Sequence, residues 1–288
     1  RGRGAETARR LHGDHEEASQ GRHRLAHLRH QRQKVKAQSL RPRGGGLQGE
    51  HKESMRDNTK TMEFYKKVYA QDSYFIENAK RRIQRVIELK GPDFKTIPSC
   101  YSSISHNYFH RFYLSYTMGM SHEELIPDLR MYIENGLKGC NGSVYGDLEN
   151  ILYLVIVFGF NEYTDTIKEI ITSIKDYQDA YMEQLYQFID NSFEITDEKL
   201  FWPKECKPFI EVIELAKTDK KAAIQRLKKF VDKQWFKTLH EGVILQEGCY
   251  RGFWCIEAAA LVKALKLDDT ELKECKYYPY DMAHFCGS

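Results

Sequence analysis

The first 54 residues contain no Phe, Tyr, Trp or Ile, although the chain has 18 Tyr and 15 Phe in all. A segment without such side chains cannot bury enough apolar surface to offset the entropy lost when it becomes ordered. These residues hold 13 Lys and Arg against 6 Asp and Glu, whereas residues 55–288 hold 31 against 35. We therefore expect a disordered basic tail over 1–54 and a folded, weakly acidic body over 55–288.

Two origins of the tail are consistent with its composition. A natural basic arm would contact nucleic acid. Alternatively, residues 1–54 are not native sequence, and the natural start lies near Met55 or Met62. The tail has ten Arg to three Lys, the body has eight Arg to 23 Lys, and position 1 is not Met. These breaks in composition favour the second origin.

The chain also lacks any C-x-x-C pair, an apolar signal segment and a long hydrophobic run. Its seven cysteines are odd in number and widely spread, which argues against a disulfide framework or a zinc ribbon. The longest apolar run, "ILYLVIVFGF" (151–160), is half of the ~20 residues that a membrane span needs. The sequence therefore predicts a reduced, soluble, cytoplasmic protein without a membrane segment.

Helical periodicity runs through the body. Apolar residues recur every three, four or seven positions from Glu63 to Lys90, which is one face of a helix that Gly91 and Pro92 would end. "SHEE" (121–124) is a capping box that opens another helix. "FWPKECKP" (201–208) is expected to be a break. The helices predicted in this way cover 63–90, 99–118, 121–137, 148–160, 163–174, 178–190, 220–235 and 252–267.

One of these segments, 148–160, is apolar on all sides, so a buried strand is an alternative to a buried helix. Helix is favoured because no strand partner occurs elsewhere. The resulting prediction is an all-α protein, a bundle-like body of eight or more helices. We expect an N-terminal helical module over 55–175 and a C-terminal module over 176–288.

Candidate catalytic residues are few. His106 and His110 lie four apart on one helical face, but the glutamate of an H-E-x-x-H site is absent, which favours two histidines in a helix contact. Cys249, Cys255 and His240 could form a thiol nucleophile with a base, although sequence alone shows no contact between them. A cysteine- or histidine-dependent hydrolase stays an alternative, while the expectation is a protein without a catalytic site, metal or cofactor.

The C-terminal segment "YRGFWCIEAAALVKALKLDDTELKECKYYPYDMAHF" (250–285) resembles the PoNi-type immunity proteins, in which an aromatic–Glu–Ala–Ala–Ala helix precedes a "YYPYD" segment. "FYLSYTMGMSHEEL" (112–125) is similar to the family's N-terminal half, so the resemblance covers roughly 55–288. The matching signature positions are Trp254, Glu257, Ala258, Ala259, Ala260, Tyr277, Tyr278, Pro279, Tyr280 and Asp281.

The resemblance implies an all-helical immunity protein that neutralises a polymorphic nuclease effector, a DNase toxin of the PD-(D/E)xK class delivered between bacteria by type VI secretion. It implies a cognate toxin as partner, with no membrane and no direct nucleic-acid contact for 55–288, and leaves a homodimer open. Because such toxins need basic surfaces to hold DNA, acidic residues are the toxin-binding candidates. These acids also stand at expected helix starts, where they would offset the helix dipole. They are Glu123, Glu124, Asp128, Asp268 and Asp269.

For "YYPYD" the favoured interpretation is a structural lock that packs the C-terminal segment against the last long helix. Pro279 fixes the backbone there, and buried tyrosines pair their hydroxyls. Glu257 would accept one of those hydrogen bonds. Direct contact with the toxin is the alternative, because Tyr and Trp are frequent interface anchors.

Overall fold

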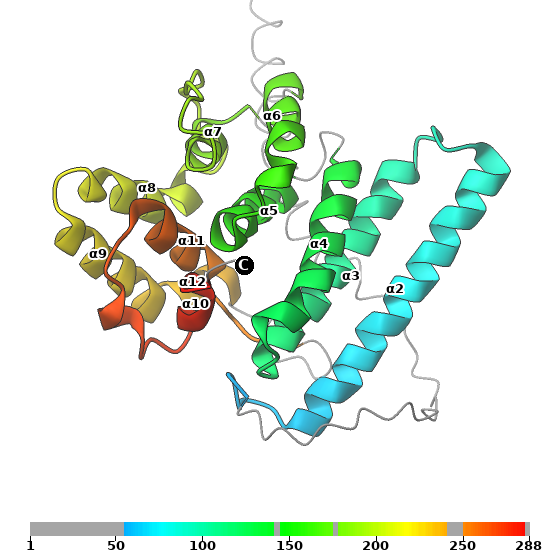
Figure 1. Cartoon of the computed structure of the whole chain (residues 1–288), viewed down its shortest axis with the longest axis horizontal. Coiled ribbons are helices and arrows are strands. Elements are labelled where there is room, and N and C mark those ends of the chain that lie inside the picture. The colour runs from blue at the N-terminus through cyan, green and yellow to red at the C-terminus, as the bar shows by residue number, and fades with distance from the viewer. Residues whose placement is uncertain (1–54, 141–144, 175–177, 241–249, 286–288) are drawn as a thin grey trace, which may run out of the picture. The chain divides into compact units, whose positions relative to one another are not determined.

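The computed structural model describes residues 55–140, 145–174, 178–240 and 250–285, and these belong to one compact unit (Figure 1). Over those ranges the chain forms α-helices and short 3-10 turns with no strand, so the all-α prediction is confirmed. The α-helices are α2 (Met62–Lys90), α3 (Ile97–Thr117), α4 (His122–Gly139), α5 (Tyr145–Phe158), α6 (Thr164–Ser173), α7 (Ala180–Gln187), α8 (Pro203–Ala216), α9 (Lys220–Lys233), α10 (Trp235–His240), α11 (Ile256–Leu265) and α12 (Tyr280–Ala283). The expected tail, 1–54, lies outside these ranges.

Helices α2, α3 and α4 pack in sequence order, with α3 between the other two (Figure 1). The chain stops helix α2 at Gly91, whose φ of +86° is unfavourable for residues with a side chain. Ser121 opens α4 through the predicted capping box, accepting from the Glu124 amide while the Glu124 carboxylate accepts from the Ser121 amide. The predicted helices in this half therefore start and stop within a few residues of their expected bounds.

Helix α5 lies at the centre of the unit, in contact with α4, α7 and α11. Apolar side chains on all faces of α5 are buried, and Ile151, Leu152 and Val155 are fully so. A helix surrounded by other helices can be apolar all round, which explains a run without amphipathic periodicity. The strand alternative for 148–160 is thereby ruled out.

The expected break at 201–208 is wrong for most of its length. Helix α8 begins at Pro203, where proline needs no amide partner and its fixed φ suits a first turn. Pro208 lies inside the helix and removes one backbone hydrogen bond. Burial of Phe209, Val212 and Ile213 on the same helix outweighs that loss.

The larger of two hydrophobic clusters runs from Ile76 in α2 to Ala283 in α12, and a smaller one joins Tyr65 and Val68 of α2 to Tyr250. The larger cluster therefore includes side chains of both expected modules, and the boundary at 175/176 stays a prediction. No helix in the described ranges is both long enough and apolar enough to cross a membrane.

Candidate functional site

The signature residue Trp254 is buried against the end of α3. Its indole N–H donates to the Thr117 hydroxyl at 2.9 Å, and its ring meets Tyr116 edge-on, with centroids 5.0 Å apart. Gly252 makes this approach possible, because its φ is +99° and an added Cβ would lie 2.3 Å from the Thr117 hydroxyl oxygen. The "RGFW" stretch is thus shaped to receive the C-terminal end of α3.

Asp281, the last residue of "YYPYD", joins three distant parts of the chain. Its carboxylate accepts from the Tyr116 hydroxyl and from Arg56 Nε, the latter at 2.6 Å. Arg56 also donates to the carbonyls of Tyr116 and Met120, at 2.9 and 2.8 Å. Burial alone would raise the pKa of Asp281, but the Tyr116 hydrogen bond and the Arg56 charge outweigh it and hold the pKa below its usual value.

Two further contacts tie the segment before Trp254 to the N-terminal part of the body. The Arg251 guanidinium meets the fully buried Asp72 of α2 with two nitrogens, at 2.9 and 2.5 Å. The Tyr250 hydroxyl donates to Asp57. We call the set formed by Arg56, Asp57, Asp72, Tyr116, Thr117, Tyr250, Arg251, Trp254 and Asp281 the junction.

The remainder of "YYPYD" packs beside α11. The Tyr277 carbonyl accepts from the Cys255 amide at 2.8 Å, which places the segment alongside the start of that helix. Tyr278 is buried, and its hydroxyl donates to the buried Asp269 at 2.5 Å. Pro279 is buried and precedes α12, and Tyr280 is partly buried beside His284.

The catalytic candidates do not come together in the part of the chain that the structure describes. Cys255 is fully buried, and burial followed by the Glu257 charge raises the pKa of its thiol well above the usual range, which disfavours the nucleophilic thiolate. His106 pairs with Asp147 at 3.1 Å, whereas burial and the nearby Arg251 lower the pKa of His110. No group of three His, Cys, Asp or Glu in the described ranges is arranged to hold a metal ion. Cys249 and the His240 side chain lie outside what is described.

The five acidic candidates separate into two kinds. Glu123 and Glu124 are exposed at the start of α4, and Asp268 is exposed and caps a turn through Thr270. Asp128 and Asp269 are buried instead. Asp128 receives two hydrogen bonds from Arg111, and Asp269 receives those of Tyr278 and His284. Those two acids stabilise the fold and do not form an accessible acidic face.

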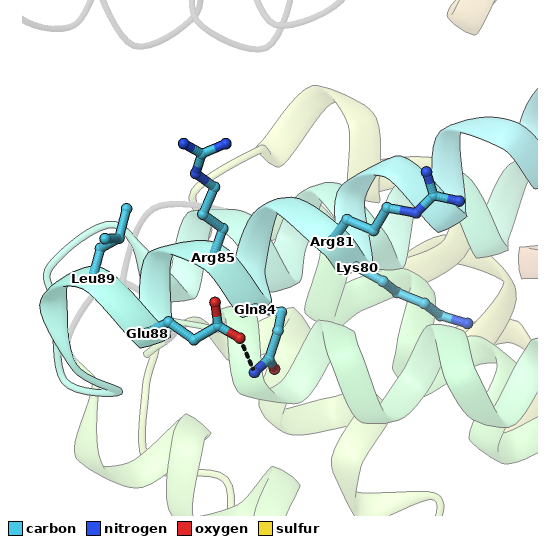
Figure 2. Close-up of a pocket in the computed structure, with 6 residues that line it drawn as sticks. All are labelled: Lys80, Arg81, Gln84, Arg85, Glu88 and Leu89. Atoms are coloured by element: carbon cyan, nitrogen blue, oxygen red, sulfur yellow. Dashed lines mark hydrogen bonds between the residues drawn. The ribbon is translucent and has the colours of Figure 1, made fainter.

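A shallow groove runs along the last three turns of α2 and is lined by Lys80, Arg81, Gln84, Arg85, Glu88 and Leu89 (Figure 2). One helix supplies all of these side chains, so the groove encloses no ligand and is not a small-molecule site. In Figure 2 the Arg85 side chain points away from the neighbouring helices, and the Arg81 side chain extends along α2. This feature was missed at the sequence level, where only the apolar face of the helix was followed.

Residues 177–282 match the family model described as "PoNe immunity proteins (PoNi), C-terminal". The matched stretch contains the whole Trp254-to-Asp281 signature. Residues 177–282, called the PoNi-matched region below, are thus similar to the C-terminal part of that family. The resemblance expected from the sequence is therefore confirmed there, and the PoNi-matched region contributes Tyr250, Arg251, Trp254 and Asp281 to the junction.

The fold has a counterpart among solved structures. Protein PA2201 from Pseudomonas aeruginosa superposes with a TM-score of 0.59 at 14% sequence identity, over 81% of this chain and 91% of that one. At this identity the likeness concerns the fold alone. It extends beyond the PoNi-matched region into the N-terminal helices. No curated protein matches the chain.

Proposed function

We propose that this protein binds a cognate DNase toxin and blocks it, and so protects the producing cell and its kin. The match of residues 177–282 to the PoNi model carries this proposal, because that family is described as immunity proteins. The site of action would be the cytoplasm, where a DNase reaches its substrate. Tight inhibition by binding is favoured by a preformed surface on a stable scaffold, because less conformational freedom is lost on association.

The junction supports such a scaffold. Its ion pairs and hydrogen bonds connect residues far apart in sequence, such as Arg56 with Asp281 and Asp72 with Arg251. We assign the "YYPYD" signature to this scaffold, as the lock that holds the C-terminal segment. A surface held in one conformation loses little entropy when the toxin binds.

A titration of DNA cleavage tests the proposal. The nuclease encoded beside this gene is mixed with increasing amounts of the full chain, and cleavage of linear duplex DNA is followed against molar ratio. We expect a sharp end point near one inhibitor per toxin. An enzyme that modified the toxin would instead inactivate many toxin molecules per copy, and undiminished cleavage at large excess would refute inhibition altogether.

Three variants separate the rival functions in the same assay. Cys255→Ser and Cys249→Ser should inhibit like the parent chain, because the proposal gives no chemistry to either thiol. A chain that starts at Met55 should also inhibit fully if residues 1–54 have no part in toxin binding. Loss of protection on that truncation, together with steeply salt-dependent DNA binding by the full chain, would favour a nucleic-acid adaptor instead.

A further inference from the structure

The outward face of α2 carries a stripe of cationic and apolar side chains. Lys67, Tyr74 and Arg81 are seven residues apart, and Arg85 follows four later, a spacing that places all four on one side of a helix. All four are exposed, and Tyr74 is 55% exposed. Leu89, one turn beyond Arg85, is 67% exposed. We call Lys67, Tyr74, Arg81, Arg85 and Leu89 the α2 stripe.

The arginines of this helix differ from the other arginines of the body. Over the described ranges, each of the five arginines outside α2 is ion-paired with a carboxylate, whereas Arg81, Arg82 and Arg85 have no such partner. The five pairs are Arg56–Asp281, Arg111–Asp128, Arg130–Glu162, Arg226–Glu211 and Arg251–Asp72. The unpaired guanidinium groups are thus gathered in little more than one helical turn.

The charge of this region is opposite to that of the whole body. Residues 80–90, "KRRIQRVIELK", hold five Lys and Arg and one Glu, although residues 55–288 together hold 31 basic and 35 acidic side chains. Lys80 is the partly neutralised member, 3.1 Å from Glu77. An acidic surface would be steered onto this helix, while a basic surface would be repelled by it.

The side chains around these cations favour a protein as the partner. Nucleic-acid sites follow the phosphate backbone with cations, yet Tyr74, Glu77, Glu88 and Leu89 interrupt the positive charge here. Arg and Tyr are the residue types enriched at the energetic centres of protein interfaces. The groove in Figure 2 is also open along its length, as a surface that receives another protein would be.

We infer that the α2 stripe docks onto an acidic patch of the partner protein, which under the proposed function is the DNase toxin. The inference rests on that proposed function. It reverses the charges expected from the sequence, which placed acidic residues on the inhibitor and a basic surface on the toxin. The inhibitor supplies cations, and the toxin supplies carboxylates. Arg81 and Arg85 are the side chains that pair with them, and Tyr74 and Leu89 flank these pairs with apolar contact.

The test compares two double charge reversals in the full chain. Arg81→Glu with Arg85→Glu alters the stripe, and Lys221→Glu with Lys229→Glu makes the same change of charge at exposed positions of α9. Association with the nuclease encoded beside this gene is measured at low and at high salt. At low salt the association rate of the α2 variant should be at least about tenfold below that of the parent chain, and at high salt the difference should be smaller. The α9 variant should keep the parent rate.

Several outcomes would overturn the inference. Equal slowing by both variants would show that only overall charge matters, and unchanged inhibition by the α2 variant would remove the stripe from the interface while leaving the proposed function intact. Failure of the parent chain to inhibit would reject both. The parent chain alone is also tested with duplex DNA and by light scattering. DNA binding or self-association that only the α2 reversal abolishes would assign the stripe to nucleic acid or to a second copy.

An alanine version keeps the test independent of helix stability. Arg81→Ala with Arg85→Ala removes both charges without placing new acids beside Glu77 and Glu88. It should give an intermediate slowing with an unchanged melting temperature. A parent-like rate for this variant would contradict the inference even if the glutamate version had perturbed the helix.

Discussion

The junction and the α2 stripe are built from the same residue types and have opposite surroundings. In the junction Arg56 and Arg251 each meet an aspartate and lie largely out of solvent, whereas Arg81 and Arg85 on α2 are exposed and unpaired among the described residues. A guanidinium that is paired within the fold already uses some of its N–H donors, whereas an unpaired one has these donors available for a partner protein. The signature residues Trp254 and Asp281 therefore make contacts that hold the chain together, and under our two proposals the toxin-binding surface lies elsewhere.

The largest effect that tests this difference between the junction and the α2 stripe is expected at Trp254. Trp254→Ala should lower the free energy of unfolding by about 3–5 kcal/mol, because the buried ring is lost and a cavity remains beside Tyr116. Trp254→Phe keeps one aromatic ring but removes part of the buried ring volume as well as the N–H bond to Thr117, so we expect a smaller loss of about 1–3 kcal/mol. Urea unfolding measures both. A loss below about 1 kcal/mol for the alanine variant would show that the signature does not hold the fold.

Asp281→Asn tests the polar part of the junction, with a smaller effect. We expect a loss of about 1–2 kcal/mol, the lower part of the range for charged hydrogen bonds, because the side chain is 44% exposed and partly screened by solvent. The folded-state pKa of Asp281 is lowered, so its contribution is present above the unfolded pKa of about 3.9 and is lost as pH falls through the folded value.

Chemical unfolding at pH 7 and at pH 3 measures this difference. The gap between the parent chain and Asp281→Asn should narrow at the lower pH. Glu271→Gln is the matched control, an exposed acid of the same C-terminal segment, and should change stability by no more than about 0.5 kcal/mol. Similar losses for both variants would point to general charge instead of the Arg56–Asp281 contact.

His106 gives a weaker effect with the opposite pH sense. Burial lowers the pKa of His106, but the hydrogen bond and charge of Asp147 and the Ser102 carbonyl outweigh it, so the pKa is raised. The stability that this histidine adds is therefore complete below the unfolded pKa of about 6.5 and is lost as pH rises through the folded value. His106→Gln should lower the free energy of unfolding by less than about 1 kcal/mol at pH 5.5, and the loss should be smaller still at pH 8.5.

The comparison between variant and parent is needed because other histidines act in the opposite direction. Burial lowers the pKa of His110 and of His122, so the stability linked to them is present at high pH and lost as pH falls. The contribution of His122 cancels in the difference between the parent chain and His106→Gln, whereas that of His110 cancels only in part, because the charge of His106 also lowers the pKa of His110. A difference that grows with pH would contradict the pairing of His106 with Asp147.

Periodicity and capping rules predicted most of the helices, because those signals are local. The Ser121 capping box and the apolar run 148–160 are examples. The break at 201–208 failed because proline was read as a breaker without regard to its place in the first turns of α8. The residues that contact the signature could not be predicted from the sequence. Asp281, for example, binds Arg56, which lies 225 positions away, and no local pattern indicates such a contact.

The burial of two of the acidic candidates, Asp128 and Asp269, could not be predicted for a related reason. A carboxylate on a helix looks the same in sequence whether an arginine 17 positions away buries it, as Arg111 does to Asp128, or water surrounds it. The α2 stripe did carry a signal, the spacing of Lys67, Tyr74, Arg81 and Arg85, but on the polar face of the helix. This spacing pointed to a binding surface only once the structure showed that the arginines outside α2 are ion-paired in the described ranges.

The smallest effect on stability, and the one that most sharpens the comparison, is expected at Tyr74 and Leu89. Their double replacement by alanine should change the free energy of unfolding by no more than about 0.5 kcal/mol, because both side chains are largely exposed. Toxin binding should nevertheless weaken by about tenfold or more, since aromatic and apolar anchors beside charged pairs carry interface energy. Ile195→Ala, an exposed apolar residue outside α2, is the control and should leave affinity unchanged. Parent-like affinity for the Tyr74/Leu89 variant, together with slowed association for Arg81→Ala/Arg85→Ala, would limit the α2 stripe to electrostatic steering, with the contact energy on another face.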